Sequence, residues 1–229
     1  MAITAIAIVI ASVIVGYFVN RQMKGSAING KLEEALGKDA GYTETIIKAG
    51  VEPTGLSYDQ LFELCDRSIE ERTNLIVELR GNYPEIRQDL KSTLISFLNS
   101  ENDLIRQKSR LYHTELAFSL ALDSFKDAKK EYDSASTFSS LRDYYSERLR
   151  TKITELEDAV YTMSGNSILF VSAYESSVKE ELLLKRAMGE EGLHFVELLQ
   201  KNKRSNLEQS RNRVQALVNA SATQISEMK

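Results

Sequence analysis

The stretch that decides the fold runs from Leu90 to Tyr132 and reads LKSTLISFLNSENDLIRQKSRLYHTELAFSLALDSFKDAKKEY. Apolar residues recur in it at every seventh position, and we call this set the packing seam: Leu90, Phe97, Leu104, Leu111, Phe118, Phe125 and Tyr132. A seven-residue repeat sustained over this length predicts one long helix that keeps the same side against partner helices, as in a coiled coil.

A second helix is predicted upstream of the packing seam. Ser57 is a suitable N-cap for a helix from Tyr58 to about Arg80, because Ser and Thr side chains accept hydrogen bonds from the first free backbone amides. The apolar residues of this helix follow alternating spacings of three and four, broken only by Arg72. Pro84 then suits the first turn of the helix that carries the seam.

Further helices are expected downstream. Ser134 to Thr137 interrupt the pattern, and a third helix is predicted from Phe138 to about Ser164. Gly165-Asn166 is predicted to be a turn, followed by one long kinked helix or two helices from Ile168 onward. Long amphipathic helices with short connections predict an all-α protein whose residues 58–229 form an elongated antiparallel helical bundle or coiled coil.

Composition agrees with a helical chain and excludes some classes of protein. The chain has 229 residues, 42% of them hydrophobic. It has only 2 Pro and 11 Gly, which are too few turn-forming residues for the many turns of a β-sandwich or barrel. The formal net charge of −4 excludes a globally basic nucleic-acid binder. The single cysteine, Cys65, cannot form an intramolecular disulfide, and we expect a small buried residue rather than a catalytic thiol.

The N-terminus predicts a single transmembrane helix. From Ala2 through Ile10 to Val19 the chain carries no charge, and at 1.5 Å per residue these positions span roughly 27 Å, close to the thickness of a bilayer core. Arg21 and Lys24 follow directly, so the positive-inside rule places the bulk of the chain in the cytoplasm. The opposite orientation stays open because only two charges decide it.

Three regions follow from these patterns. Residues 1–24 are the anchor and its basic flank, residues 25–57 a glycine-rich tether with short helices, and residues 58–229 the helical bundle.

Some residues of the bundle resemble the LemA family. The stretch LYHTELAFSLALDSFKDAKKEYD, Leu111 to Asp133, is similar to that family's pattern at Leu111, Thr114, Glu115, Ala121, Phe125, Tyr132 and Asp133, and the family's R-x-D-L-I resembles Arg72-Thr73-Asn74-Leu75-Ile76. The chain departs from the family at Val77, Leu116 and Leu122, where the family has Pro, Asn and Arg. The resemblance implies an N-terminal anchor followed by a long helical bundle, and it carries over no catalytic residues.

Motifs for chemistry are scarce. Glu191-Gly-Leu-His194 is the only Glu-x-x-His, whereas a di-iron bundle needs two with further glutamates, so we expect no metal or cofactor. The sequence contains no GxSxG, GxxxxGK[ST], GxGxxG or CxxC motif. We therefore expect that this protein is not an enzyme and has no small-molecule substrate.

One segment departs from the even mixture of charges. It contains five basic residues against the single acid Glu208: Lys201, Lys203, Arg204, Arg211 and Arg213. Such a segment can contact anionic lipid or nucleic-acid phosphates, but no aromatic residue is interleaved with it, so a solvated helical face or an intersubunit ion-pair surface is the preferred interpretation.

These patterns predict a single-pass membrane scaffold or adaptor that touches the bilayer through its N-terminal helix and self-associates or docks partner proteins. Two alternatives stay open: a helical envelope component that faces away from the cytoplasm, as in lysis, secretion or virion membrane proteins, and a metal-binding helical-bundle enzyme.

Overall fold

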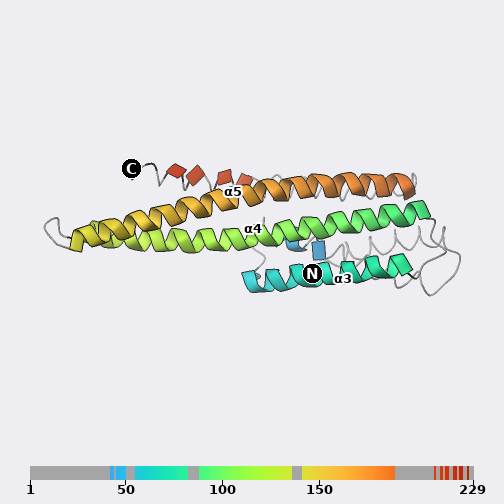
Figure 1. Cartoon of the computed structure of the whole chain (residues 1–229), viewed down its shortest axis with the longest axis horizontal. Helices are drawn as coiled ribbons and strands as arrows, with labels where there is room; N and C mark the ends of the chain where they lie inside the picture. The colour runs from blue at the N-terminus through green and yellow to red at the C-terminus, as the bar shows by residue number, and fades with distance from the viewer. Residues whose placement is uncertain are drawn as a thin grey trace. The chain divides into compact units, whose positions relative to one another are not determined.

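The computed structural model describes residues 42–43, 45–49, 55–81, 88–135 and 141–188, together with separate positions between 209 and 226. These residues are almost entirely helical and include no strand, so the predicted all-α class is confirmed for them. Three long helices follow one another along the chain: α3 (Tyr58–Gly81), α4 (Gln88–Ser134) and α5 (Leu141–Met188) (Figure 1).

The chain divides into two compact units. Unit 1 comprises Met1–Ser109 and Phe170–Ser210, and unit 2 comprises Arg110–Leu169 and Arg211–Lys229. Helices α4 and α5 each contribute one part to each unit, whereas α3 belongs to unit 1 alone.

Helix α3 begins where the sequence predicts. The backbone amide of Gln60 donates to Ser57 Oγ at 3.3 Å, and the amide of Ser57 donates to Gln60 Oε1 at 2.8 Å. This reciprocal pair is a capping box, which satisfies two backbone amides that have no partner within the helix. The predicted N-cap at Ser57 is therefore confirmed.

Helix α4 is continuous over its 47 residues, which corresponds to about 70 Å. It ends at Ser134, where the sequence pattern breaks.

Helix α5 is longer than predicted. The predicted turn at Gly165-Asn166 is wrong, because α5 runs unbroken for 48 residues from Leu141 to Met188. A glycine within a helix costs about 1 kcal/mol relative to alanine. Met163 and Phe170 lie seven residues apart on either side of it and are 0% and 2% exposed. Burying two such side chains stabilises by about 1.5–3 kcal/mol each, which outweighs the cost of the glycine.

Unit 1 packs α3 and the first part of α4 in antiparallel fashion. Arg72 forms a hydrogen bond with Asn102. Cys65 lies earlier in α3 than Arg72, and it forms a hydrogen bond with Ser109, which lies later in α4 than Asn102. The core of unit 1 combines apolar residues from all three helices and the short helical stretch before them, including Ile46, Cys65, Leu79, Leu98, Leu104, Ile105 and Tyr174.

The parts of α4 and α5 in unit 1 are also antiparallel. Ser96 donates to Glu180 at 2.8 Å, whereas Lys108, twelve residues further along α4, lies 4.9 Å from the ring centroid of Phe170, ten residues earlier in α5.

Unit 2 joins the second part of α4 to the first part of α5 as a helical hairpin. Arg148 forms an ion pair with Glu131, and the guanidinium of Arg142 lies 5.1 Å from the ring centroid of Tyr132. The buried residues that hold the hairpin together include Leu111, Tyr112, Phe118, Phe125, Leu156 and Met163. An antiparallel arrangement is thus present within each unit.

The predicted membrane anchor, with Ala2, Ile10, Val19, Arg21 and Lys24, lies outside the described residues. Within the described part of the chain, no helix has both the length and the apolar character needed to cross a bilayer. The anchor stays a prediction.

Candidate functional site

The most unusual feature of unit 1 is a cluster of hydrogen bonds around Arg72, the residue that breaks the apolar spacing of α3. Arg72 is 1% exposed. Its Nη1 donates to Asn102 Oδ1 at 3.0 Å, and its Nη2 donates to Thr43 Oγ1 at 3.0 Å and to Ser68 Oγ at 2.9 Å. One guanidinium thereby links α3 to α4 and to Thr43, which precedes α3 in the chain.

The amide of Asn102 continues the cluster. Its Nδ2 donates to Thr73 Oγ1 at 3.3 Å, so the side chain of Asn102 accepts from Arg72 and donates to the next residue of α3. Because both ends of this amide are engaged by α3, a shift of α4 along α3 by one turn breaks both bonds.

More charged side chains are buried between α4 and α5. Glu101 is 2% exposed and accepts a hydrogen bond from Ser177, which is fully buried. Lys108 is fully buried, and its ammonium lies over the face of Phe170, a favourable cation–π position. Glu181 and Lys185, one turn apart in α5, are 4% and 3% exposed.

Three buried charged residues of α4 have a recognisable spacing in the sequence. Glu101, Lys108 and Glu115 are spaced by seven residues, and each lies four residues after a member of the packing seam. All three are buried. A second set of buried residues therefore repeats every seven positions beside the packing seam. Its members Glu101, Lys108 and Glu115 are charged, and the member seven residues before Glu101, Leu94, is apolar.

We call the buried polar residues of unit 1 the polar core: Thr43, Ser68, Arg72, Glu101, Asn102, Lys108, Ser177, Glu181 and Lys185. Charges in a protein interior add little net stability because desolvation offsets their attraction. Removing one partner is costly, however, since it leaves the other buried without its bond. The polar core is thus suited to fixing which helix faces meet and in which register.

Cys65 lies in α3 next to this region and is fully buried. Burial and, to a smaller extent, the negative charge of Asp66 raise the pKa of its thiol to about 11, although Lys108 and a hydrogen bond with Ser109 oppose the shift. A thiol that stays protonated at neutral pH is a poor nucleophile. The predicted burial of Cys65 is confirmed.

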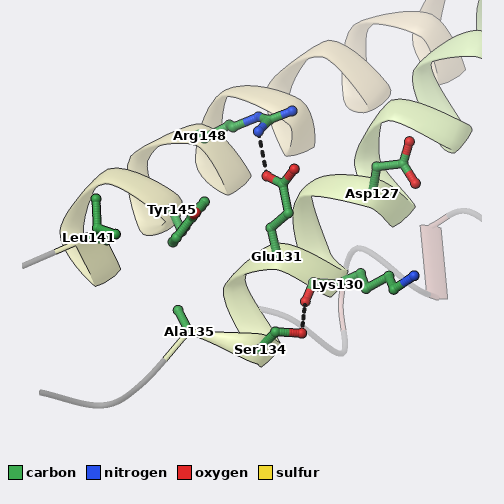
Figure 2. Close-up of a pocket in the computed structure, with 8 residues that line it drawn as sticks. All are labelled: Asp127, Lys130, Glu131, Ser134, Ala135, Leu141, Tyr145 and Arg148. Atoms are coloured by element: carbon green, nitrogen blue, oxygen red, sulfur yellow. Dashed lines mark hydrogen bonds and ion pairs between the residues drawn. The ribbon is translucent and has the colours of Figure 1, made fainter. Parts of the chain in front are cut away.

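Unit 2 carries an open groove at the end of its hairpin. Figure 2 shows its lining, to which α4 contributes Asp127, Lys130 and Glu131 and α5 contributes Leu141, Tyr145 and Arg148. The two acids and the two bases balance, and Arg148 already pairs with Glu131 across the groove. This charge balance favours no particular class of small ligand.

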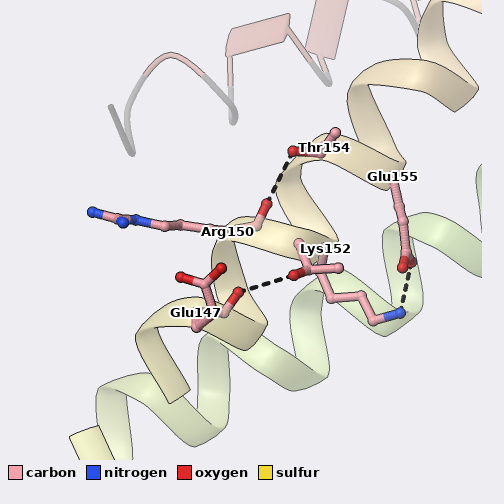
Figure 3. A network of polar contacts seen from close by, with 6 residues as sticks. Glu147, Arg150, Lys152, Thr154 and Glu155 are labelled. Atoms are coloured by element: carbon pink, nitrogen blue, oxygen red, sulfur yellow. Dashed lines mark hydrogen bonds and ion pairs between the residues drawn. The ribbon is translucent and has the colours of Figure 1, made fainter. Parts of the chain in front are cut away.

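In unit 2, α5 is rich in hydroxyl and charged residues. Thr151 and Thr154 donate to the backbone carbonyls of Glu147 and Arg150, at 3.1 and 3.2 Å, and Lys152 pairs with Glu155 at 2.6 Å (Figure 3). The guanidinium of Arg150 extends away from the helices in the same view.

Large apolar side chains are also exposed in unit 2. Six of them lie on its two helices: Leu120, Leu141, Tyr144, Tyr161, Ile168 and Leu169. Tyr161 is the most exposed at 83%. The surface of this unit therefore mixes apolar, hydroxyl and charged groups, a composition that protein interfaces share.

The residues of the packing seam differ in burial. Leu90, Leu104, Leu111, Phe118 and Phe125 are buried, and Phe97 and Tyr132 are partly exposed.

The basic segment is only partly covered by the structure. Arg213 is helical and exposed, whereas Lys201, Lys203, Arg204 and Arg211 lie outside the described residues.

The described residues contain no group of three or more histidine, cysteine or carboxylate side chains placed to hold a metal ion. His113 is exposed on α4, and Glu191 and His194 lie outside the described residues.

Comparisons with family models, with curated proteins and with solved structures found no match to this chain. The resemblance to the LemA family stays a prediction from the quoted residues.

Proposed function

We propose that this chain is a membrane-anchored helical scaffold that self-associates or docks partner proteins at the bilayer. The observation that carries the proposal is the concentration of exposed large apolar side chains on the helices of unit 2, among them Tyr144, Tyr161 and Ile168. Such side chains on a helical surface are typical of places where another protein binds. The uncharged run from Ala2 to Val19 supports attachment to a membrane.

Two features of the described helices support a mechanical rather than a chemical role. The polar core ties α3, α4 and α5 to one register through buried hydrogen bonds, which favours a unit of fixed shape. The long continuous helices α4 and α5 supply surface along their whole length. In this proposal unit 1 is the rigid base and unit 2 presents the binding surface.

Membrane attachment is tested first by fractionation of cells that express the full chain. We expect the full chain to stay with membranes through an alkaline carbonate wash. A variant without residues 2–24 should be released, and circular dichroism should show that its remaining residues keep their helical content. Release of the full chain by the wash would contradict the proposed anchor.

Orientation is tested with a cysteine placed on the surface, because the buried thiol of Cys65 is a poor reporter. In a Cys65→Ala background, Ser124→Cys puts a thiol on an exposed position of α4. A membrane-impermeant maleimide should label it only after cells are opened if the bulk of the chain is cytoplasmic. Labelling of intact cells would instead support the envelope-facing alternative.

Association is tested by sedimentation of the detergent-solubilised full chain and by crosslinking in native membranes. We expect a defined oligomer or a stable complex with another protein. A chain that stays monomeric in detergent and crosslinks to nothing in membranes would refute the scaffold.

A further inference from the structure

The described positions near the C-terminus present a polar helical side to solvent. Ten positions between 209 and 226 are described, and all ten are helical and exposed. None of them carries an apolar side chain larger than that of alanine, and Gln215 donates to Asn219 along this side at 3.0 Å. At 100° per residue the ten positions fall on one half of a helix.

The other half of the same segment carries an apolar pattern in the sequence. Positions 207, 211, 214, 218, 221, 225 and 228 alternate steps of four and three, and five of the seven residues are apolar. We call this set the C-terminal stripe: Leu207, Arg211, Val214, Val218, Ser221, Ile225 and Met228. A helix with one polar side and one apolar stripe packs the stripe against another surface.

The surface available to the C-terminal stripe lies in unit 2. Residues Arg211–Lys229 form one compact unit with Arg110–Leu169, the hairpin of α4 and α5. The inner sides of this hairpin are buried against each other, so a third helix has to use an outer side. Among the described residues of the hairpin, five of the six exposed large apolar side chains lie on α5, and only Leu120 lies on α4. An outer side of α5 is therefore the better fit.

One line of exposed residues follows α5 through unit 2. Positions 144, 147, 151, 154, 158, 161, 165 and 168 alternate steps of three and four and are all exposed, and we call them the outer face of α5. At 100° per residue this face is opposite to the buried Leu156 and Met163. Tyr161 is 83% exposed and Ile168 68%. The outer face is roughly 36 Å long, and the C-terminal stripe as a helix is roughly 32 Å long.

The chain that follows α5 is long enough to bring the C-terminal stripe to this face. Helix α5 ends at Met188, and the chain re-enters unit 2 at Arg211. Along α5, Met188 lies roughly 30 Å beyond Ile168, and residues 189–206 span roughly 27 Å even if they are helical. Leu207 can thus lie level with Ile168, where α5 leaves unit 2, and the stripe then continues antiparallel to α5.

We propose that residues 207–228 dock through the C-terminal stripe on the outer face of α5 of the same chain and so shield the apolar side chains that a partner would bind. In this arrangement Val214 is level with Tyr161, and Ser221 is level with Thr154. The docking is independent of what the protein does, whereas its role in controlling the binding of partners rests on the proposed function.

Intramolecular crosslinking of the detergent-solubilised full chain tests the docking. In a Cys65→Ala background, Thr154→Cys combined with Ser221→Cys should be joined within one chain by a short thiol-to-thiol reagent, and intact mass should show a crosslinked monomer. Asn219→Cys, on the exposed polar side of the segment, is the matched control. It should crosslink to Thr154→Cys at least tenfold more slowly, because it points to the opposite side of the helix from Ser221.

Charges placed on the C-terminal stripe test the same contact from the other side. Val218→Asp with Ile225→Asp should release the segment, because a buried carboxylate without a partner is costly. Release should abolish the crosslink and raise the rate at which a maleimide labels Thr154→Cys by roughly tenfold. Ala216→Asp with Thr223→Asp adds the same two charges at exposed positions, so it should change neither result.

The effect on partners is measured with the same two pairs of variants. The released chain should associate more strongly in sedimentation, or crosslink to more of another protein in native membranes, than the chain with the exposed charges. A docking crosslink combined with no association in either chain would refute the scaffold and, with it, the controlling role of the segment.

Two other results would overturn the docking and leave the scaffold standing. The first is a Thr154→Cys that crosslinks equally to Ser221→Cys and to Asn219→Cys, or to neither. The second is a crosslink that joins two chains instead of one, which would show that the stripe binds a second copy.

Discussion

Replacement of Arg72 by alanine should loosen unit 1 far more than removal of an arginine from the surface. Arg72 is 1% exposed and donates three hydrogen bonds, at 3.0 Å to Asn102, 3.0 Å to Thr43 and 2.9 Å to Ser68. Arg72→Ala leaves these oxygens without their donor and opens a cavity. A buried acceptor left without its donor costs about 1–3 kcal/mol and the cavity adds to this cost, so we expect a decrease of about 3–5 kcal/mol in the free energy of opening.

The buried thiol of Cys65 supplies the assay. Because the thiol is 0% exposed, a thiol reagent reaches it only when α3 opens, and the labelling rate under native conditions reports the population of the open state. A loss of 3–5 kcal/mol corresponds to labelling that is roughly 100- to 4,000-fold faster, since each 1.4 kcal/mol is a factor of ten. The rate is measured on the full chain in detergent over a series of low urea concentrations.

Two variants separate the contributions. Arg72→Met keeps most of the volume and removes the hydrogen bonds, so its cost should be smaller, about 1–3 kcal/mol. Arg67→Ala removes an arginine that is 57% exposed and pairs with Glu63, and it should change labelling less than threefold. Labelling of Arg72→Ala within threefold of the unmodified chain would refute the assigned role of the cluster.

Three further predictions concern packing, helix propensity and pH. Leu104→Ala, at a position 0% exposed, should destabilise by about 2–5 kcal/mol in urea unfolding followed by circular dichroism, whereas Leu120→Ala, at 61% exposed, should be near neutral; equal effects would contradict the assigned core. Gly165→Ala should stabilise by about 0.5–1 kcal/mol and raise the melting temperature, because the glycine is helical and its added methyl meets nothing; a lower melting temperature would show strain at that turn. Because folding raises the pKa of the Cys65 thiol from 9.0 to about 11, the folded state holds its proton more tightly, so this contribution is intact below pH 9 and is lost as pH rises toward 11. The Cys65→Ala variant should lose less stability over that interval, and parallel pH profiles for the two proteins would exclude the effect.

Local sequence signals were sufficient for several elements. The N-cap at Ser57 fixed the start of α3, and the seven-residue repeat predicted one uninterrupted helix through Leu104 and Phe125. These features depend on hydrogen bonds and periodicities within a few residues, which a sequence displays directly. For the same reason the burial of Cys65 on the apolar side of α3 was predictable.

The predicted break in α5 was wrong because tertiary packing outweighed the low helix propensity of the local sequence. Gly165 and Asn166 weaken a helix in isolation, but the buried side chains of Met163 and Phe170 hold the segment helical on both sides. The sequence shows the local cost of the glycine and hides the compensating burial.

By itself the sequence determined that the described chain is helical, where α3 begins and where α4 ends, because these depend on residues near one another along the chain. Only the tertiary structure decided what the charged residues on the buried sides of the helices do. Arg72 appears as an interruption in the sequence, yet packing surrounds it with Thr43, Ser68 and Asn102. A buried charge is tolerated only where hydrogen-bond partners surround it, and two of these partners, Thr43 and Asn102, lie about thirty residues from Arg72 in the chain.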